Sequence, residues 1–157
     1  MTISDTLSKI KKQADALSAK TDAFNTTLDH IEAELRGSGI EFWWHAGPMY
    51  GMHLSKTDEE IEREYHVLGY TKIGNEWHLA IQRWVDRSVP STTGTENWSE
   101  PENSEPVALA RTSRALRIEI APDLERFLEA LSAQIDKMTV AVDNANALVS
   151  PTRGGHR

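Results

Sequence analysis

The histidines are the residues of this sequence that most invite metal chemistry, because four of the six lie between residues 43 and 84. These four are His45, His53, His66 and His78. No pair has the His-x-His spacing, and no His-Glu-x-x-His motif is present, so both common zinc signatures are missing. The strand register described below also directs His66 and His78 to opposite faces of a hairpin. We therefore expect no metal site and no cofactor, and interpret these histidines as surface or strand-end residues.

Acid–base chemistry has one candidate group, since Glu62 and Glu64 would share a strand face with His66. Proton transfer requires a perturbed pKa in a cleft, and acidic runs such as residues 58–64 are usually solvated. Nucleophilic chemistry has no motif: cysteine is absent, and Gly-x-Ser-x-Gly, P-loop and Gly-x-Gly-x-x-Gly patterns are missing. A small hydrolase that uses His and Glu is therefore only the third interpretation, after two noncatalytic ones.

Three arginines, Arg111, Arg114 and Arg117, follow one another at steps of three. On a helix this spacing forms a stripe that could hold a phosphate or carboxylate through paired N–H groups. The stripe could instead pair with nearby acidic residues, and we favour that structural role. It is still the best ligand candidate, because guanidinium groups beside aromatic rings bind nucleotides and single strands. The predicted ligand- or partner-binding residues are Arg111, Arg114, Arg117, Trp44, Tyr65, His78 and Trp84.

The composition limits the class of protein. With 157 residues the chain is most simply one domain, residues 1–150, with a flexible tail at residues 151–157. The net charge of −7 and the scattered basic residues disfavour binding to duplex nucleic acid. Because the sequence has no signal peptide and no run of about 20 apolar residues, we expect a cytoplasmic protein that does not enter a membrane.

Two helices must position these groups, because apolar residues recur at alternating steps of four and three over residues 3–36 and 123–149. This heptad pattern is typical of helices that pack along another long helix. Ala14 and Thr21 weaken a parallel two-stranded zipper, so we expect an antiparallel assembly. The first seam is Ile3, Leu7, Ile10, Ala14, Leu17, Thr21, Phe24, Leu28, Ile31 and Leu35, and the second is Leu124, Leu128, Leu131, Ile135, Met138, Val142, Ala145 and Val149.

The middle of the chain, residues 40–86, is predicted to form a small antiparallel sheet. Gly74-Asn75 between two strand-like runs indicates a type II′ hairpin turn, which sets Ile73 opposite Glu76. Side chains of a strand alternate between its faces, so the register assigns every residue to a face. We expect the helices to cover the face with Leu68, Tyr70, Trp77, Leu79 and Ile81, while the other face, with Tyr65, Val67, Thr71, His78, Gln82 and Trp84, is partly solvated or used for binding.

The segments around this hairpin are assigned from local patterns. Residues 40–45 are predicted to form a strand, residues 46–49 a turn, and residues 50–55 a weaker second strand or an ordered loop. A short helix is predicted to begin at Thr57. The acidic, Pro- and Ser-containing stretch 87–106 is predicted to be a flexible loop, either a disordered insert or a lid held down by Trp98. Helices are predicted over residues 107–121 and 123–149, with a break at a proline.

These patterns predict an α+β fold in which two long heptad-patterned helices, N- and C-terminal, flank a small Trp-rich antiparallel sheet, and a helical bundle holds a homo-oligomer, in the first place a dimer. We expect a noncatalytic interaction or regulatory protein, adaptor- or inhibitor-like, that oligomerises through its helices and binds an unidentified protein partner through its aromatic sheet. The alternative is a protein that binds a nucleotide or other small anion between the Arg stripe and an aromatic pocket.

Overall fold

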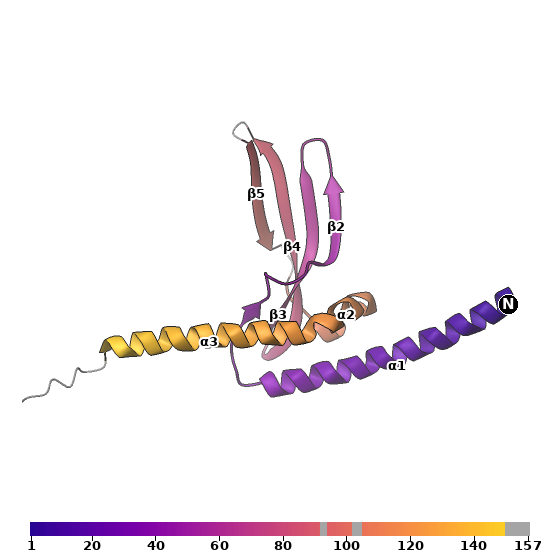
Figure 1. The fold of residues 1–157 in the computed structure, drawn as a ribbon, viewed down its shortest axis with the longest axis horizontal. Coiled ribbons are helices and arrows are strands. Elements are labelled where there is room, and N and C mark those ends of the chain that lie inside the picture. The colour runs from indigo at the N-terminus through magenta and orange to yellow at the C-terminus, as the bar shows by residue number, and fades with distance from the viewer. Residues whose placement is uncertain (92–93, 102–104, 150–157) are drawn as a thin grey trace, which may run out of the picture.

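The structure, a computed structural model, describes residues 1–91, 94–101 and 105–149 and consists of one sheet with helices packed across one end (Figure 1). The helices are α1 (Ile3–Leu35), α2 (Arg114–Ile120) and α3 (Leu124–Val149), and two 3-10 turns, η1 (Leu109–Arg111) and η2 (Ala121–Asp123), adjoin α2. The strands are β1 (Phe42–Trp43), β2 (Tyr50–Lys56), β3 (Ile61–Ile73), β4 (Glu76–Ser91), β5 (Gly94–Pro101) and β6 (Val107–Ala108). In Figure 1, α1 and α3 extend beyond the sheet on opposite sides.

The long antiparallel hairpin β3–β4 is the centre of the sheet. Each of the other described strands pairs with one of its arms, β1 and β2 with β3, and β5 and β6 with β4. Ile73 pairs with Glu76, and Gly74 has a φ of 63° whereas Asn75 has a negative φ, as a type II′ turn requires. The turn and the register predicted from the sequence are therefore confirmed.

The hydrophobic core lies between one face of the β3–β4 hairpin and the helices. Leu68 and Tyr70 of β3 and Leu79 and Ile81 of β4 form the sheet side of this core. The helices contribute the fully buried side chains Leu28 from α1, Ile120 from α2 and Phe127 from α3. The sheet face that was expected to lie on the helices does so.

The predicted fold class is wrong, although the protein is of mixed α+β type. The terminal helices do not flank a small sheet, because both pack on the same face of a curled, six-stranded sheet, α1 through Leu28 and α3 through Phe127. Among the described residues, the backbone contacts of α1 are mainly with β4 and α2 rather than with α3, so the two helices do not pair along their length. The physical reason is that the buried part of each seam packs into one core with the sheet and α2.

The second sheet face is covered from within the chain by Trp43. Trp43 pairs with Gly69, and a Cβ atom added at Gly69 would lie 2.2 Å from the Trp43 ring. Glu41 holds this arrangement, since it accepts hydrogen bonds from the Trp43 indole N–H at 3.2 Å and from the Thr71 hydroxyl at 2.8 Å. Trp44 points the other way and contacts Phe127, so adjacent tryptophans serve opposite faces.

Residues 50–55 lie in a strand rather than an ordered loop, but this strand does not pair with residues 40–45. Strands β1 and β2 each pair with β3, near its two ends, because β3 is long enough to hold both. The helix expected at Thr57 is also absent: Thr57 closes the β2–β3 turn, where its hydroxyl accepts a hydrogen bond from the Glu60 N–H at 3.0 Å. This side-chain hydrogen bond is the one expected of a helix cap. Because the residues before and after it belong to the paired strands β2 and β3, the segment forms a hairpin turn instead of a helix.

The acidic stretch 87–106 is not a loop over the part that the structure describes. Strand β4 continues to Ser91, and β5 pairs with it, with Trp98 opposite Arg87. Most of β5 is exposed, so backbone pairing with β4 rather than burial holds it in place.

The helix predicted over residues 107–121 begins only at Arg114. Val107 and Ala108 pair with β4 instead, and the Ser113 hydroxyl accepts a hydrogen bond from the Leu116 N–H at 3.3 Å to start α2. Pro122 lies in η2 between α2 and α3, at the expected break. The flexible tail predicted for residues 151–157 lies outside the described residues.

Candidate functional site: two projecting helix segments

The N-terminal part of α1, Ile3–Leu17, extends beyond the sheet, and we call it the α1 overhang (Figure 1). A capping box starts the helix: the Thr2 hydroxyl accepts from the Asp5 N–H at 3.2 Å, and the Asp5 carboxylate accepts from the Thr2 N–H at 3.0 Å. These hydrogen bonds hold the pKa of Asp5 below its ordinary value. Along the overhang the seam is open to solvent: Leu7 is 61% exposed, whereas Leu28, at the same heptad position further along the helix, is 0% exposed.

The C-terminal part of α3, Ile135–Val149, is a second projecting segment, and we call it the α3 overhang (Figure 1). Its seam is exposed from Met138 onward, with Val142 57% exposed. The start of the same seam is buried in the core through Leu124 and Leu131. No helix in the described ranges has the length and apolar content needed to cross a membrane. Both long helices thus change from a covered to an uncovered seam along their length.

The two overhangs carry opposite net charge. The α1 overhang has three lysines and two aspartates, and the α3 overhang has one lysine and two aspartates. These charges lie beside the seams rather than in them, so the seams themselves are apolar.

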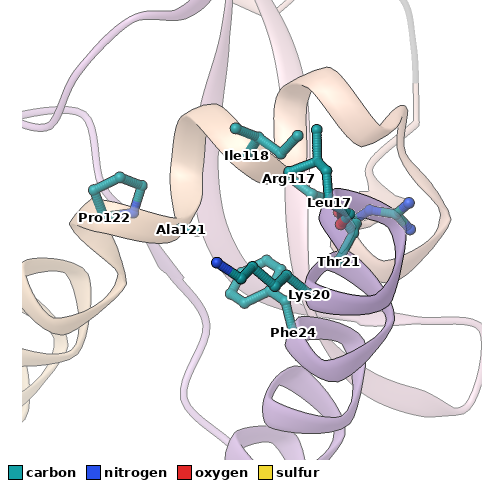
Figure 2. A pocket seen from close by; sticks show the side chains of 8 residues that line it. All are labelled: Leu17, Lys20, Thr21, Phe24, Arg117, Ile118, Ala121 and Pro122. Atoms are coloured by element: carbon teal, nitrogen blue, oxygen red, sulfur yellow. Dashed lines mark hydrogen bonds between the residues drawn. The ribbon is translucent and has the colours of Figure 1, made fainter. Parts of the chain in front are cut away.

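A cavity of about 190 Å³ marks the point where the α1 seam passes beneath α2 (Figure 2). Its α1 side is formed by Leu17, Lys20, Thr21 and Phe24, which are spaced like the four residues that make a hole in helix–helix packing. The Thr21 hydroxyl donates to the Leu17 carbonyl at 2.8 Å, so the polar seam residue is satisfied within its own helix. The opposite side comes from α2 and η2 and consists of Arg117, Ile118, Ala121 and Pro122.

The three arginines of the predicted stripe do not share one surface. The Arg117 guanidinium donates to the Ala110 carbonyl at 2.8 Å, and Arg114 donates to the Ser18 hydroxyl of α1 at 2.7 Å. Arg111 lies in η1, before α2 begins, and lines a different cavity from Arg117. Two of the three thus hold the segment around α2 in place, through a hydroxyl and a carbonyl rather than through the acidic residues expected from the sequence.

The aromatic residues of the predicted site also do not form one surface, since each has different neighbours. Trp44 is buried against Phe127, with the Arg126 guanidinium 5.5 Å from its ring centroid. Tyr65 donates to Asp86 at 2.8 Å on the other sheet face, and burial together with this carboxylate raises the pKa of Tyr65 to about 12. The Trp84 ring contacts the His45 ring at a centroid distance of 4.6 Å.

His78 and Arg111 of the predicted set line the same cavity, which has a volume of about 470 Å³ and is also lined by Glu76. The His78 ring lies between two carboxylates, with Glu32 of α1 at 3.3 Å and Glu76 at 3.5 Å. Glu32 also accepts a hydrogen bond from the Leu79 N–H at 3.0 Å. No sequence pattern indicates this contact, because Glu32 lies in a helix far from His78 along the chain.

The acid–base candidates Glu62 and Glu64 form ion pairs between β3 and β4. Glu64 pairs with Arg83, and this guanidinium holds the pKa of Glu64 below its ordinary value. Glu62 pairs with Arg87 at 3.2 Å. Within residues 1–91, 94–101 and 105–149, no three His, Asp or Glu side chains are grouped so that they could hold a metal ion.

The most distinctive surface of the molecule is therefore the pair of overhangs with their exposed seams. Periodicity identified these residues, but not that half of each seam would be covered by the sheet and half left open. Similarity offers no further guide, because comparison of the chain with protein families, curated proteins and solved structures finds no match.

Proposed function

We propose that this is a noncatalytic interaction protein that associates with a second copy of itself through the α1 and α3 overhangs. The observation that carries the proposal is the exposed seam, which runs from Ile3 to Leu17 on α1 and from Met138 to Val149 on α3. An adaptor or inhibitor-like role suits an acidic chain whose dimer would present two sheets on a shared helical support, and the proposal keeps the cytoplasmic location expected from the sequence.

Physical chemistry supports a second copy as the occupant. Contiguous exposed apolar stripes on a folded protein usually mark an interface. A helical segment of about 15 residues is also only marginally stable alone in water, and packing along an apolar face is the usual source of its stability. Pairing with another overhang would bury the apolar seam and would also stabilise the helical segment.

The partner-binding role of the aromatic sheet has less support. Trp44, Tyr65 and Tyr70 are buried within the chain, so they are not available as an open aromatic surface. The large exposed apolar side chains of the described strands lie instead on the outer strands, at Met52 and Leu54 of β2, Trp98 of β5 and Val107 of β6. A protein partner that contacts the sheet would meet these strands first.

A small-anion binder is the second candidate, and the cavity shared by Arg111 and His78 favours it. Glu76 in the same cavity and Glu32 beside His78 oppose it, since carboxylates repel an anionic ligand. Thermal stabilisation by nucleotides or inorganic phosphate that is lost in Arg111→Gln would support this candidate, and an unchanged melting temperature with every anion would count against it.

Two valines of α3 give a matched test of the leading proposal. Val142 and Val140 are 57% and 58% exposed, but Val142 belongs to the second seam whereas Val140 lies on the outer face of the same helix. We expect Val142→Ser to weaken association by about tenfold or more, and Val140→Ser to leave it unchanged, because only the first removes a covered methyl pair. Light scattering after size exclusion measures both. Equal behaviour of the two variants would overturn the proposal.

A further inference from the structure

The α1 and α3 overhangs point to opposite sides of the sheet (Figure 1). The α1 overhang is the N-terminal part of its helix, and the α3 overhang is the C-terminal part of its helix. A rotation of one copy by 180° therefore places its α3 overhang on the side of the other copy's α1 overhang, with the helix directions opposed. A two-fold axis generates the same contact twice, which closes the assembly at two copies.

The spacing of the two seams fits this arrangement. From Ile3 to Leu17 the seam residues follow one another at steps of four, three, four and three. From Val149 back to Ile135 the steps are again four, three, four and three. Because the spacings agree when one helix is read in reverse, every seam residue of one overhang meets a seam residue of the other, and each overhang spans about 21 Å at roughly 1.5 Å per residue.

The sizes of the facing residues also fit. In this register the small residue of each overhang lies opposite a large residue of the other, Ala14 opposite Met138 and Ala145 opposite Leu7. Alternation of large and small side chains across an interface lets two helices interdigitate without voids. The five layers are Ile3 with Val149, Leu7 with Ala145, Ile10 with Val142, Ala14 with Met138, and Leu17 with Ile135.

Pairing of each overhang with its own copy fits less well. Read in reverse, the α1 overhang has steps of three, four, three and four, so Ile3 to Leu17 does not align with itself layer by layer. A shift that restores the alignment either sets Ile3 against Thr21, which is already buried in its own chain, or sets Ile3 against Ala14 and leaves Leu17 without a facing residue. Like pairs also bring together overhangs of the same net charge, whereas the mixed pair joins opposite charges.

We propose that the α1 overhang of one copy packs antiparallel on the α3 overhang of a second copy, in the register that sets Ala14 against Met138. This inference rests on the proposed function, because it assigns the geometry of the same self-association. The interface that results is isologous, with two equivalent helix pairs that extend on either side of the two-fold axis.

Cysteine cross-linking tests the pairing directly, because the chain has no cysteine of its own. Ala14→Cys and Met138→Cys are prepared as separate proteins, mixed, unfolded, refolded together and oxidised. We expect a disulfide-linked dimer in the mixture and none in either protein alone, since the two residues face each other only across copies. A mixture of Ala14→Cys with Val140→Cys is the matched control, in which the second cysteine lies on the outer face and no cross-link is expected.

The outcomes separate this inference from the proposed function. A cross-link in Ala14→Cys alone or in Met138→Cys alone overturns the mixed pairing while self-association stands. The mixed pairing is also overturned, again without loss of self-association, if the mixture sediments as a dimer but forms no disulfide. Sedimentation of the wild-type protein as a monomer overturns both proposals together.

Discussion

The two halves of α1 follow one heptad pattern but have opposite surroundings. From Thr21 to Leu35 the seam packs against α2 and the sheet, and Leu28 there is completely buried. From Ile3 to Leu17 the same pattern faces solvent. Helix α3 repeats the contrast in reverse, with its first turns in the core and its last turns exposed. Periodicity therefore identifies the face that will be covered, but not whether a sheet, a helix or another copy covers it.

The largest expected effect distinguishes the two halves of α1 through two equivalent leucines. Leu28→Ala should lower the free energy of unfolding by roughly 2–5 kcal/mol, because it opens a cavity in the closed core. Leu7 has the same heptad position in the α1 overhang, and Leu7→Ala should lower the free energy of unfolding of the monomer by about 1 kcal/mol or less. Urea unfolding at several protein concentrations measures both, and only the Leu7 variant should differ from wild type in concentration dependence. Equal losses would show that the overhang is part of the core.

A second substitution tests whether the sheet is covered by its own chain, in contrast to the overhangs. Gly69→Ala places a Cβ atom 2.2 Å from the Trp43 ring, so the ring must move away. We expect a loss of about 1–3 kcal/mol, typical of overpacking in a filled site, and a red shift of tryptophan emission as the ring becomes solvated. Gly74→Ala is unsuitable as a control because Gly74 has a positive φ, so Lys72→Ala on the same strand serves instead. Unchanged stability and emission in Gly69→Ala would contradict the close packing of Trp43.

A smaller effect is expected at the contact that joins the buried half of α1 to β4. Glu32→Gln keeps the shape of the side chain but weakens its bonds to the Leu79 N–H and the His78 ring. The expected cost is about 1–2 kcal/mol at neutral pH, typical of hydrogen bonds that involve a charged group. Glu34→Gln, elsewhere on the same helical turn, is the control. If the two variants unfolded at the same urea concentration, the contact between Glu32 and β4 would not contribute to stability.

The smallest effect at neutral pH concerns the three tyrosines, all of which lie in the sheet. Burial raises the pKa of Tyr50, Tyr65 and Tyr70 above the ordinary value of 10.0, and that of Tyr65 reaches about 12. Since the folded state holds these protons more tightly than the unfolded state, the stability they contribute is complete below pH 10 and is lost as the pH rises toward 12.

Absorbance at alkaline pH tests this pH dependence. No native tyrosine should ionise with an ordinary pKa, and the free energy of unfolding should fall above pH 10 less steeply in Tyr65→Phe than in wild type. An ordinary titration at pH 10 in the folded protein would show that the tyrosines are open to water.

The sequence was a good guide where the structure depends on neighbours in the chain. The Gly74-Asn75 turn and the β3–β4 register follow from turn chemistry and alternation, and both were predicted. The seam of α1 was equally local, because it follows from the spacing of apolar residues along one helix. Strand β5 was missed because its acidic residues suggested a loop. Its pairing with β4 depends on backbone hydrogen bonds, which leave no pattern in the side chains.

The candidate site shows the same division. The seam residues were identified by spacing, but the contact between Glu32 and His78 joins a helix to a strand across 46 positions and has no local signal. The Arg stripe was predicted as one helical surface, and it divides because Val107 and Ala108 pair with β4, which delays the helix to Arg114. Pairing between segments far apart in the chain therefore determined where α2 begins and which residue contacts His78, and local spacing could predict neither.

Sedimentation equilibrium of the wild-type protein over a wide concentration range tests the self-association most directly. We expect the mass to rise with concentration and to level at twice the chain mass of 17.6 kDa, because the two overhangs of each copy are satisfied by one partner. A mass of 17.6 kDa at every concentration would contradict self-association, since the exposed seams would then remain uncovered in solution.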